Sequence, residues 1–580
     1  MLFSSLQMAG SAMSASTIGI QVAGQNLTNV NTPGYIREQT VLETASPYSK
    51  NGTTVGNGVS VTGVRQMIDL YLEERVRNAL SDANGSSQQN KTYTDLETLL
   101  GELSVNDISS SLTGFFNAID NVLNEPENVT YRKMVAGEGQ SLAEQINYTS
   151  QKVLELQIDL NKQVDSIASQ INELVSQVQS LNVEISRIEA GAGNSTEAVG
   201  LRDQRYAALT SLSQLINIRT HENENGVVSV FCGSDPLIVE GTVRKVSVKY
   251  DNDANADLSA AFLSIESTGN KLDVASGQLH GLYVSRDEIL GSFAAELEQY
   301  ATSLIWEFNN LYASGQGLTG YSELMSINAV EDADAALNAA GLDFPPVNGS
   351  FRILLTNSES GKTSTTDIFI SLGEIKANND PFGVDSSKST NGTSLNDLAE
   401  AISAIDGLTA VVTTDNRLEI KAESPEVTFA FDNDTSGVLS ALGVNTFFTG
   451  SSAKTIGVNQ VMYDDPTKFA ASSTGVGADT QNAELLASMP EMSLSSLNNQ
   501  TITEYYRNIY NATIQKAGTV SALAVANSTY YASLESQKQS ISGVNLDEET
   551  INLLAYQRSY QATARYVTVI NEMLESLLNM

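Results

Sequence analysis

Apolar and small residues recur at alternating spacings of four and three at both ends of the chain. The N-terminal series is Leu2, Leu6, Ala9, Met13, Ser16, Ile20, Ala23 and Leu27. The C-terminal series is Leu546, Leu553, Tyr560, Val567 and Leu574, with Tyr556, Ile570 and Leu577 between them. A 3.5-residue period is typical of helices that wrap around a partner helix. The pattern therefore predicts a pairing helix at each end of the chain.

The longest regular series of this kind lies inside the chain. It consists of Leu160, Val164, Ile167, Ile171, Leu174, Val178, Leu181, Ile185 and Ile188. This pattern predicts a left-handed coiled coil. Residues 191–195 interrupt it with two glycines, and a second helix over about 197–215 is expected to run back. Residues 150–215 are therefore predicted to form a long helical hairpin.

Other stretches alternate or cluster as strands do. Residues 36–66, 226–250 and about 345–450 are rich in β-branched residues and turn signals. Residues 284–313 and the chain from about 480 onward return to helical spacing, with a break at Ser542 and Gly543. If the two terminal helices pair antiparallel, the ends of the chain meet and the β-rich middle becomes an insertion.

This order predicts an α+β multidomain protein, in which a long α-helical coiled-coil or bundle region from both chain ends carries β-rich inserted domains in the middle. Five parts are expected. They are an N-terminal assembly helix with an extended segment (1–66), a helical rod domain with the hairpin 150–215 and a small β part 226–284 (67–325), a β-rich inserted outer domain (326–455), return helices of the rod domain (456–541) and a C-terminal assembly helix (542–580).

Charge limits the partners. The formal net charge is −36, which disfavours nucleic acid and anionic membranes because both are bound by clustered Lys and Arg. The first charged residue is Arg37, so a positively charged signal-peptide start is missing. No apolar run approaches the twenty residues that a membrane helix needs. We expect neither a membrane span nor a cleaved secretory signal, a combination that leaves export by another route open.

Candidate catalytic residues are few. The chain has two histidines, His221 and His280, and one cysteine, Cys232, too few for an ordinary zinc site. A P-loop and a GxSxG motif are absent from the sequence. His221 and Glu222 are expected to be a surface pair. We therefore expect no enzyme, no metal and no cofactor.

A helix start is encoded at residues 542–549, Ser-Gly-Val-Asn-Leu-Asp-Glu-Glu. Asn545 is the expected N-cap, and Glu548 is expected to close a capping box. The acidic residues that follow the cap suit the positive end of the helix dipole.

The two ends carry long motifs that occur together. Residues 26–35, Asn-Leu-Thr-Asn-Val-Asn-Thr-Pro-Gly-Tyr, resemble the N-terminal signature of bacterial flagellar axial proteins, the rod, hook and hook-associated proteins. Residues 542–549 and 556–565 resemble the C-terminal signature of the same group. The motif positions are Asn26, Asn29, Asn31, Thr32, Pro33, Gly34, Tyr35, Gly543, Asn545, Asp547, Gln557 and Tyr560. Pro33 and Gly34 are also suited to a type II turn that ends the first helix.

A third segment narrows the resemblance. Leu201-Arg202-Asp203-Gln204-Arg205-Tyr206 is similar to a segment of the hook-associated protein 1 family, the hook–filament junction proteins. Tyr206 stands where an acidic residue is usual in that family, a small departure.

The resemblance implies a structural protein that joins hook to filament by helical self-assembly through its terminal helices. The implied partners are other copies of the chain, the hook protein, the next hook-associated protein and a type III export chaperone. The implied location is the extracellular flagellum. The expected assembly residues are Leu6, Met13, Ile20, Leu27, Leu546, Leu553, Tyr560, Val567 and Leu574.

Two alternatives remain open at this stage. A flagellin-like filament subunit belongs to the same machine, but its C-terminal signature differs from the one seen here. An extracellular coiled-coil adhesin, with the β-rich middle as its receptor-binding part, needs an anchor or a conventional signal, and the sequence shows neither.

Overall fold

The computed structural model describes residues 2–50, 53–101, 107–189, 198–223, 225–251, 258–372 and 392–579. The chain forms two compact units. Unit 1 comprises Met1–Tyr93, Gln157–Ile289 and Ala517–Met580, and unit 2 comprises Thr94–Leu156 and Leu290–Lys516. The finer five-part division stays a prediction.

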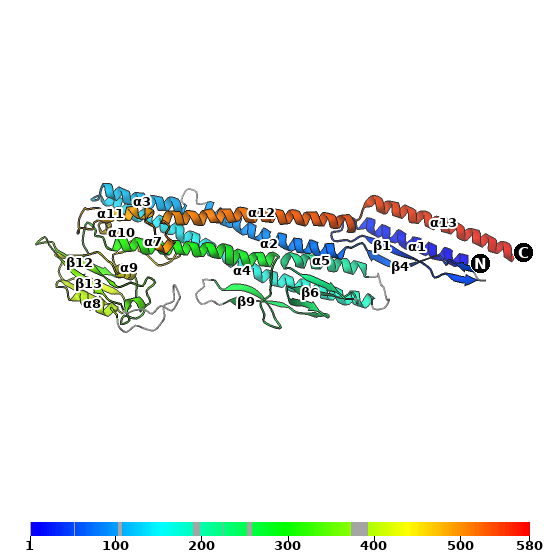
Figure 1. Ribbon diagram of the computed structural model, residues 1–580, viewed down its shortest axis with the longest axis horizontal. Coiled ribbons are helices and arrows are strands. Elements are labelled where there is room, and N and C mark those ends of the chain that lie inside the picture. The colour runs from blue at the N-terminus through cyan, green and yellow to red at the C-terminus, as the bar shows by residue number, and fades with distance from the viewer. Residues whose placement is uncertain are drawn as a thin grey trace. The chain divides into compact units, whose positions relative to one another are not determined.

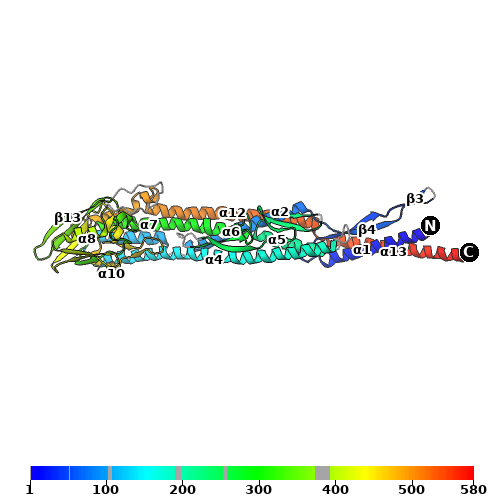
Figure 2. The same ribbon diagram turned by 90° about the horizontal axis from the view of Figure 1, so that it is seen from below.

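The helices that contribute to unit 1 include both terminal ones. They are α1 (Leu2–Thr28), α2 (Leu70–Gly101), α4 (Val129–Glu189), α5 (Val199–Leu215), α6 (Gln278–Tyr283), the π-helical η1 (Val284–Leu290), α12 (Ile502–Ser542) and α13 (Leu546–Leu578). Figure 1 shows α1 in blue and α13 in red side by side, with the chain ends close together, and the turned view in Figure 2 agrees. The predicted break at Ser542 and Gly543 is confirmed as the boundary between α12 and α13.

The strands of unit 1 form short antiparallel sheets. They are β1 (Glu38–Thr44), β2 (Tyr48–Lys50), β3 (Thr53–Val55), β4 (Val59–Gln66), β5 (Arg219–Glu222), β6 (Val228–Cys232), β7 (Asp235–Val239), β8 (Thr242–Val243), β9 (Val246–Asp251) and β10 (Ala260–Ile265). β1 pairs with β4, β2 with β3 and β9 with β10, and β5 to β8 make a four-stranded meander. The predicted extended segment after the first helix is therefore confirmed as the β1–β4 ribbon.

Helix α4 holds these strands with three asparagines. Asn161, Asn172 and Asn182 each directly follow a residue of the apolar series, at Leu160, Ile171 and Leu181. Each asparagine uses its amide as a strand uses its backbone, donating from Nδ2 to a carbonyl and accepting an N–H at Oδ1. The partners are Ser259 and Ala261 for Asn161, Val246 for Asn172 and Val228 for Asn182. This part of α4 therefore packs against β-strands. The apolar series predicted a helix as the partner of α4, but a seven-residue period does not distinguish a helical partner from a strand.

Unit 2 combines helices with antiparallel sheets. It contains α3 (Ile108–Asn124), α7 (Gly291–Ala313), α8 (Leu395–Ser403), α9 (Val438–Leu442), α10 (Val461–Asp464), α11 (Gln481–Ser488), the 3-10 turns η2 (Leu337–Ala339), η3 (Pro466–Lys468), η4 (Met489–Glu491) and η5 (Ser495–Leu497), and the strands β11 (Glu323–Met325), β12 (Gly349–Asn357), β13 (Lys362–Ile370), β14 (Leu408–Val412), β15 (Leu418–Ala422), β16 (Val427–Asp432), β17 (Phe448–Thr449) and β18 (Gly457–Val458). The strand orders are β13–β12–β16, β11–β15–β14 and β17–β18.

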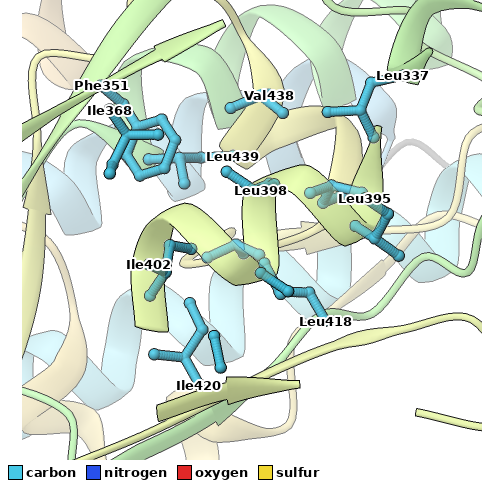
Figure 3. Packing of buried hydrophobic residues seen from close by; sticks show 14 of the residues in the cluster. Leu337, Phe351, Ile368, Leu395, Leu398, Ile402, Leu418, Ile420, Val438 and Leu439 are labelled. Atoms are coloured by element: carbon cyan, nitrogen blue, oxygen red, sulfur yellow. The ribbon is translucent and has the colours of Figure 1, made fainter. Parts of the chain in front are cut away.

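The core of unit 2 packs α8 against its sheets. Figure 3 shows Leu395, Leu398 and Ile402 of α8 among Phe351, Ile368 and other buried apolar side chains. Ser394 caps α8 through a complete capping box with Asp397. The α+β multidomain class predicted from the sequence is thus confirmed.

Candidate assembly interface

Helices α1 and α13 pack antiparallel within unit 1. Ser16 Oγ donates to Ser559 Oγ at 3.2 Å, and Asn26 Nδ2 donates to Glu549 Oε2 at 3.0 Å. From Ser16 to Asn26 the residue number on α1 rises by ten, while that of the partner on α13 falls by ten, from 559 to 549. The two helices are therefore antiparallel. The two chain ends thus pack against each other, which is one of the two arrangements that the sequence pattern left open.

Small residues let the two helices approach closely. The buried positions of α1 include Ala9, Ala15, Ser16 and Ala23. At Gly19, a Cβ atom would lie 2.6 Å from the ring of Tyr556. The aromatic ring of α13 therefore fills the space that the missing side chain leaves, a contact that tolerates only glycine on α1.

The amide of Asn26 is the centre of a buried polar network, and this residue is fully buried. Its Nδ2 donates to Glu38 O at 2.9 Å as well as to Glu549, while its Oδ1 accepts from Tyr35 Oη at 2.8 Å and Glu38 N at 3.0 Å. One side chain therefore ties α1, the turn after it, strand β1 and helix α13 together.

Arg37 makes a second link between the ends. Its guanidinium pairs with Glu548 at 2.9 Å and with Glu549 at 2.8 Å. The backbone N–H of Arg37 donates to the backbone carbonyl of Ser542 at 2.9 Å. Asn545 caps α13 by accepting from Asp547 N and Glu548 N, as predicted. The predicted capping box is wrong, because within the described chain the carboxylate of Glu548 pairs with Arg37 instead of returning to the cap.

The N-terminal motif folds as a tight turn. Tyr35 N donates to Thr32 O at 3.2 Å, and Gly34 has a φ of +79°, the left-handed value that the third residue of a type II turn needs. Asn29 Nδ2 donates to Gln25 O at 3.0 Å, in the last turn of α1. Asn31 and Pro33 are exposed. A cavity of about 430 Å³ separates this turn from residues 542–544, so both motifs line one hollow.

The third motif supports the same region from α5. Gln66 Nε2 donates to Asp203 Oδ1, and the backbone of Ile36 also hydrogen-bonds to Asp203. The pKa of Asp203 is raised overall to about 7. Burial is the largest cause, and the negative charge of Glu38 also raises this pKa, while the hydrogen bonds from Gln66 and Ile36 lower it. Burial likewise raises the pKa of Glu38. Asp203 and Glu38 thus form a buried acidic corner in which neither carboxylate has a described cationic partner.

The arginines of the third motif build the fold of α5. Arg202 pairs with both oxygens of Glu189 at 2.9 Å and with Glu222 at 2.6 Å. Arg205 is fully buried and donates to Asn182 Oδ1 at 3.0 Å and Gly226 O at 2.5 Å. Glu222 is therefore an ion-pair partner of these arginines, so the expected surface pair with His221 is wrong.

The expected assembly residues occupy mixed positions. Leu6, Met13, Ile20, Leu27, Leu553, Val567 and Leu574 are half-buried. Leu546 and Tyr560 are exposed, with exposed fractions of 52% and 38%. Gln557 is also exposed. Contacts of these residues with another copy stay a prediction.

A second apolar face on α13 escaped the sequence interpretation. Ile551, Leu554 and Val569 are exposed by 66%, 46% and 49% and share a face with Arg558 and Arg565. Spacings of three and four from Ile551 lead to Leu554, Arg558, Ala562, Arg565 and Val569. The arginines within this series hid it from a search for a purely apolar stripe.

Within the described residues, no group of three or more His, Cys, Asp and Glu side chains is placed to hold a metal ion. In the same part of the chain, no helix is long and apolar enough to cross a membrane. Cys232 is a free, buried thiol, and burial raises its pKa to about 12. The arrangement around the termini is one of packing and ion pairing.

Comparisons with known proteins agree with this arrangement. The flagellar hook-associated protein FlgK helical domain matches residues 93–324, and the flagellar basal body rod FlgEFG protein C-terminal domain matches residues 535–580. The second match covers α13 and the end of α12.

Curated relatives match along the whole chain. Flagellar hook-associated protein 1 of Escherichia coli strain K12 is 24% identical over 577 residues, which covers 98% of each chain. Flagellar hook-associated protein 1 of Bacillus subtilis strain 168 is 24% identical over 588 residues, covering 100% of this chain and 98% of the relative. The flagellar hook junction protein FlgK from Burkholderia pseudomallei has a similar fold, with a TM-score of 0.50 and 16% identity over 81% of this chain and all of that one.

These matches are to structural proteins of the bacterial flagellum, and the C-terminal end of the chain matches a domain of the flagellar rod proteins. Along nearly its whole length the chain is similar to flagellar hook-associated protein 1, and residues 93–324 match the helical domain of that protein.

Proposed function

We propose that this chain forms the junction between the flagellar hook and filament and that copies of it assemble through α1 and α13. Three resemblances support the junction role: the helical-domain match, the relatives that share its full length and the fold it shares with a hook junction protein. The role is mechanical and requires no catalysis. The assembly role depends on the structure of the two chain ends.

One observation carries the assembly proposal. Helix α13 uses one face to pack on α1 and leaves a second face, with Ile551, Leu554 and Val569, exposed. Exposed contiguous apolar faces mark interaction sites, and burying such area stabilises an assembly by about 25 cal/mol per Å². A helix with two apolar faces suits a tube in which every terminal pair is flanked by further pairs.

The partners follow from this position. At its two ends a junction ring meets the hook protein and the next hook-associated protein, and around its circumference it meets other copies of itself. We further propose export through the flagellar type III channel, assisted by a chaperone, because the resemblance to flagellar hook-associated proteins implies this route. The outcome is an extracellular location on the flagellum.

Deletion of the gene tests the junction role. The expected cells carry hooks without filaments and release flagellin into the medium, and the full chain supplied from a plasmid restores filaments. Cells that keep normal filaments after the deletion contradict the proposal. A loss of hooks as well would place the chain earlier in the structure than proposed.

A further inference from the structure

A second cavity in unit 1 lies beside the acidic corner. It has a volume of about 230 Å³ and lies between α1, the β1–β4 ribbon and the first turn of α5. Its lining includes Ile18, Gln21, Val22, Gln25, Val64 and Val199, together with Glu38. The walls thus combine four aliphatic side chains with two amides and one carboxylate.

Glu38 has no compensation for its charge. Its exposed fraction is 6%, and within the described chain its carboxylate neither accepts a hydrogen bond nor forms an ion pair. Asn26 binds the backbone of Glu38 and not its carboxylate. The nearby Arg37 is directed to Glu548 and Glu549.

A second buried carboxylate near Glu38 also lacks a cationic partner in the described chain. Asp203 is another buried carboxylate of this corner, with an exposed fraction of 8%, and its described hydrogen bonds are to neutral groups, Gln66 and the backbone of Ile36. Isolated buried carboxylates are costly unless they are paired. A cavity with both aliphatic and polar walls beside such a group fits a side chain with an apolar stem and a cationic head, as Arg and Lys have.

Helix α13 presents cations of this kind. Arg558 and Arg565 are both exposed, and within the described chain neither makes an ion pair or a hydrogen bond. They are seven residues apart, so they share one helix face. That face also holds the exposed Ile551, Leu554 and Val569, and it lies away from the face that contacts α1.

We propose that the cavity at Glu38 receives an arginine of α13, Arg558 or Arg565, from a second copy of this chain. The guanidinium pairs with Glu38 and approaches Asp203, while the stem lies along Ile18 and Val22. The exposed apolar residues beside the arginine then cover the outer side of α1. This inference rests on the proposed assembly through α1 and α13 and names the residues that join adjacent copies.

Cysteine cross-linking tests the contact. Full-length chains that carry Gln21→Cys with Arg558→Cys, or Gln21→Cys with Arg565→Cys, replace the native chain in cells, and isolated flagella are oxidised mildly. Gln21 is exposed at the cavity rim, and a disulfide forms only when the two Cα atoms are within about 7 Å. We expect disulfide-linked multimers on a non-reducing gel for at least one pair. The three chains that carry only one of these substitutions are the controls and are expected to stay monomeric, because the native Cys232 is buried.

The outcomes separate two failures. Flagella that contain the chain but give only monomers with both pairs overturn the arginine contact and leave the junction role intact. Flagella from which the native chain is absent overturn the proposed function itself. Multimers of equal yield from a chain with only one added cysteine also count against the contact, because they show unspecific linking.

Charge removal gives a second, independent readout. Glu38→Gln is close in size to the native residue, and Glu43→Gln on the same strand is the matched control because Glu43 is exposed. The variants are Glu38→Gln and either Arg558→Gln or Arg565→Gln, whichever arginine position cross-links. As salt is raised, we expect each variant to be released from isolated flagella severalfold more than the Glu43→Gln control. Release equal to that of Glu43→Gln in a folded Glu38→Gln chain overturns the proposal.

Discussion

Asn26 on α1 donates a hydrogen bond from Nδ2 to Oε2 of Glu549 on α13, across 523 positions of the chain. Both residues are nearly or fully buried, and both lie in the motifs that resemble flagellar axial proteins. The same asparagine holds Tyr35 and the backbone of Glu38. The two motifs thus form one polar joint that sets the register of the terminal helices.

Asn26→Ala is expected to weaken this joint strongly. The change leaves the N–H and carbonyl of Glu38, Tyr35 Oη and an oxygen of Glu549 without a partner, and a buried unpaired polar group costs about 1–3 kcal/mol. Hydrogen exchange of the α1 amides is expected to show a loss of protection of about 2–3 kcal/mol. The matched control is Asn29→Ala, whose side chain bonds within the described residues to Gln25 and Thr32 and should lose under about 1 kcal/mol. Equal losses contradict the joint.

Gly19 gives a test of the close helix contact. Gly19→Ala places a methyl group 2.6 Å from Tyr556, so overpacking should destabilise the α1–α13 pair by about 1–3 kcal/mol. Gly24→Ala on the same helix meets nothing within 4 Å and should stabilise it by about 0.5–1 kcal/mol, since alanine favours helix. Chemical denaturation of both variants measures the difference, and effects of the same sign would count against the antiparallel register.

Asp203 makes stability depend on pH. Its pKa is about 7 in the folded chain against an ordinary value of 3.8, so between about pH 4 and 7 the folded chain holds a proton that the unfolded chain does not. The stabilisation from this group therefore falls as pH rises through that window, and it levels off above the window. The total fall is about 1.4 kcal/mol for each unit by which the folded pKa exceeds the unfolded pKa. Glu38, whose pKa burial also raises, acts in the same direction.

Unfolding midpoints measured at a series of pH values check this expectation. Asp203→Asn is expected to flatten the slope between pH 4 and 7, and Asp547→Asn, at an exposed position, is expected to leave it unchanged. An unchanged slope in the Asp203→Asn chain would show that other groups set the pH dependence.

The sequence predicted the elements well because local patterns determine them. The 3.5-residue series gave α1 and α13, Pro33 and Gly34 gave the turn, and Asn545 gave the cap of α13. These features depend on residues within one or two turns of each other. Their physical causes, apolar periodicity and capping, are readable from a short window.

The contacts that hold the site together were out of reach for the opposite reason. Glu548 suited a capping box locally, but an arginine 511 positions away, Arg37, forms the stronger charged pair with it. Asn161, Asn172 and Asn182 were ordinary polar residues until the strands came beside α4. The burial of Glu38 and Asp203 likewise arises only when α1, β1 and α5 meet.

The outer face of α13 gives the most direct test of assembly through the terminal helices. The measurement is electron microscopy of flagella, with an assay of the medium, for cells in which the double variant Ile551→Lys, Val569→Lys replaces the native chain. Both side chains are exposed, so folding and export should persist, and Val525→Lys on exposed α12 is the matched control. The account predicts hooks without filaments and folded variant chain in the medium. Filaments as numerous and as firmly held as those of the control would contradict it.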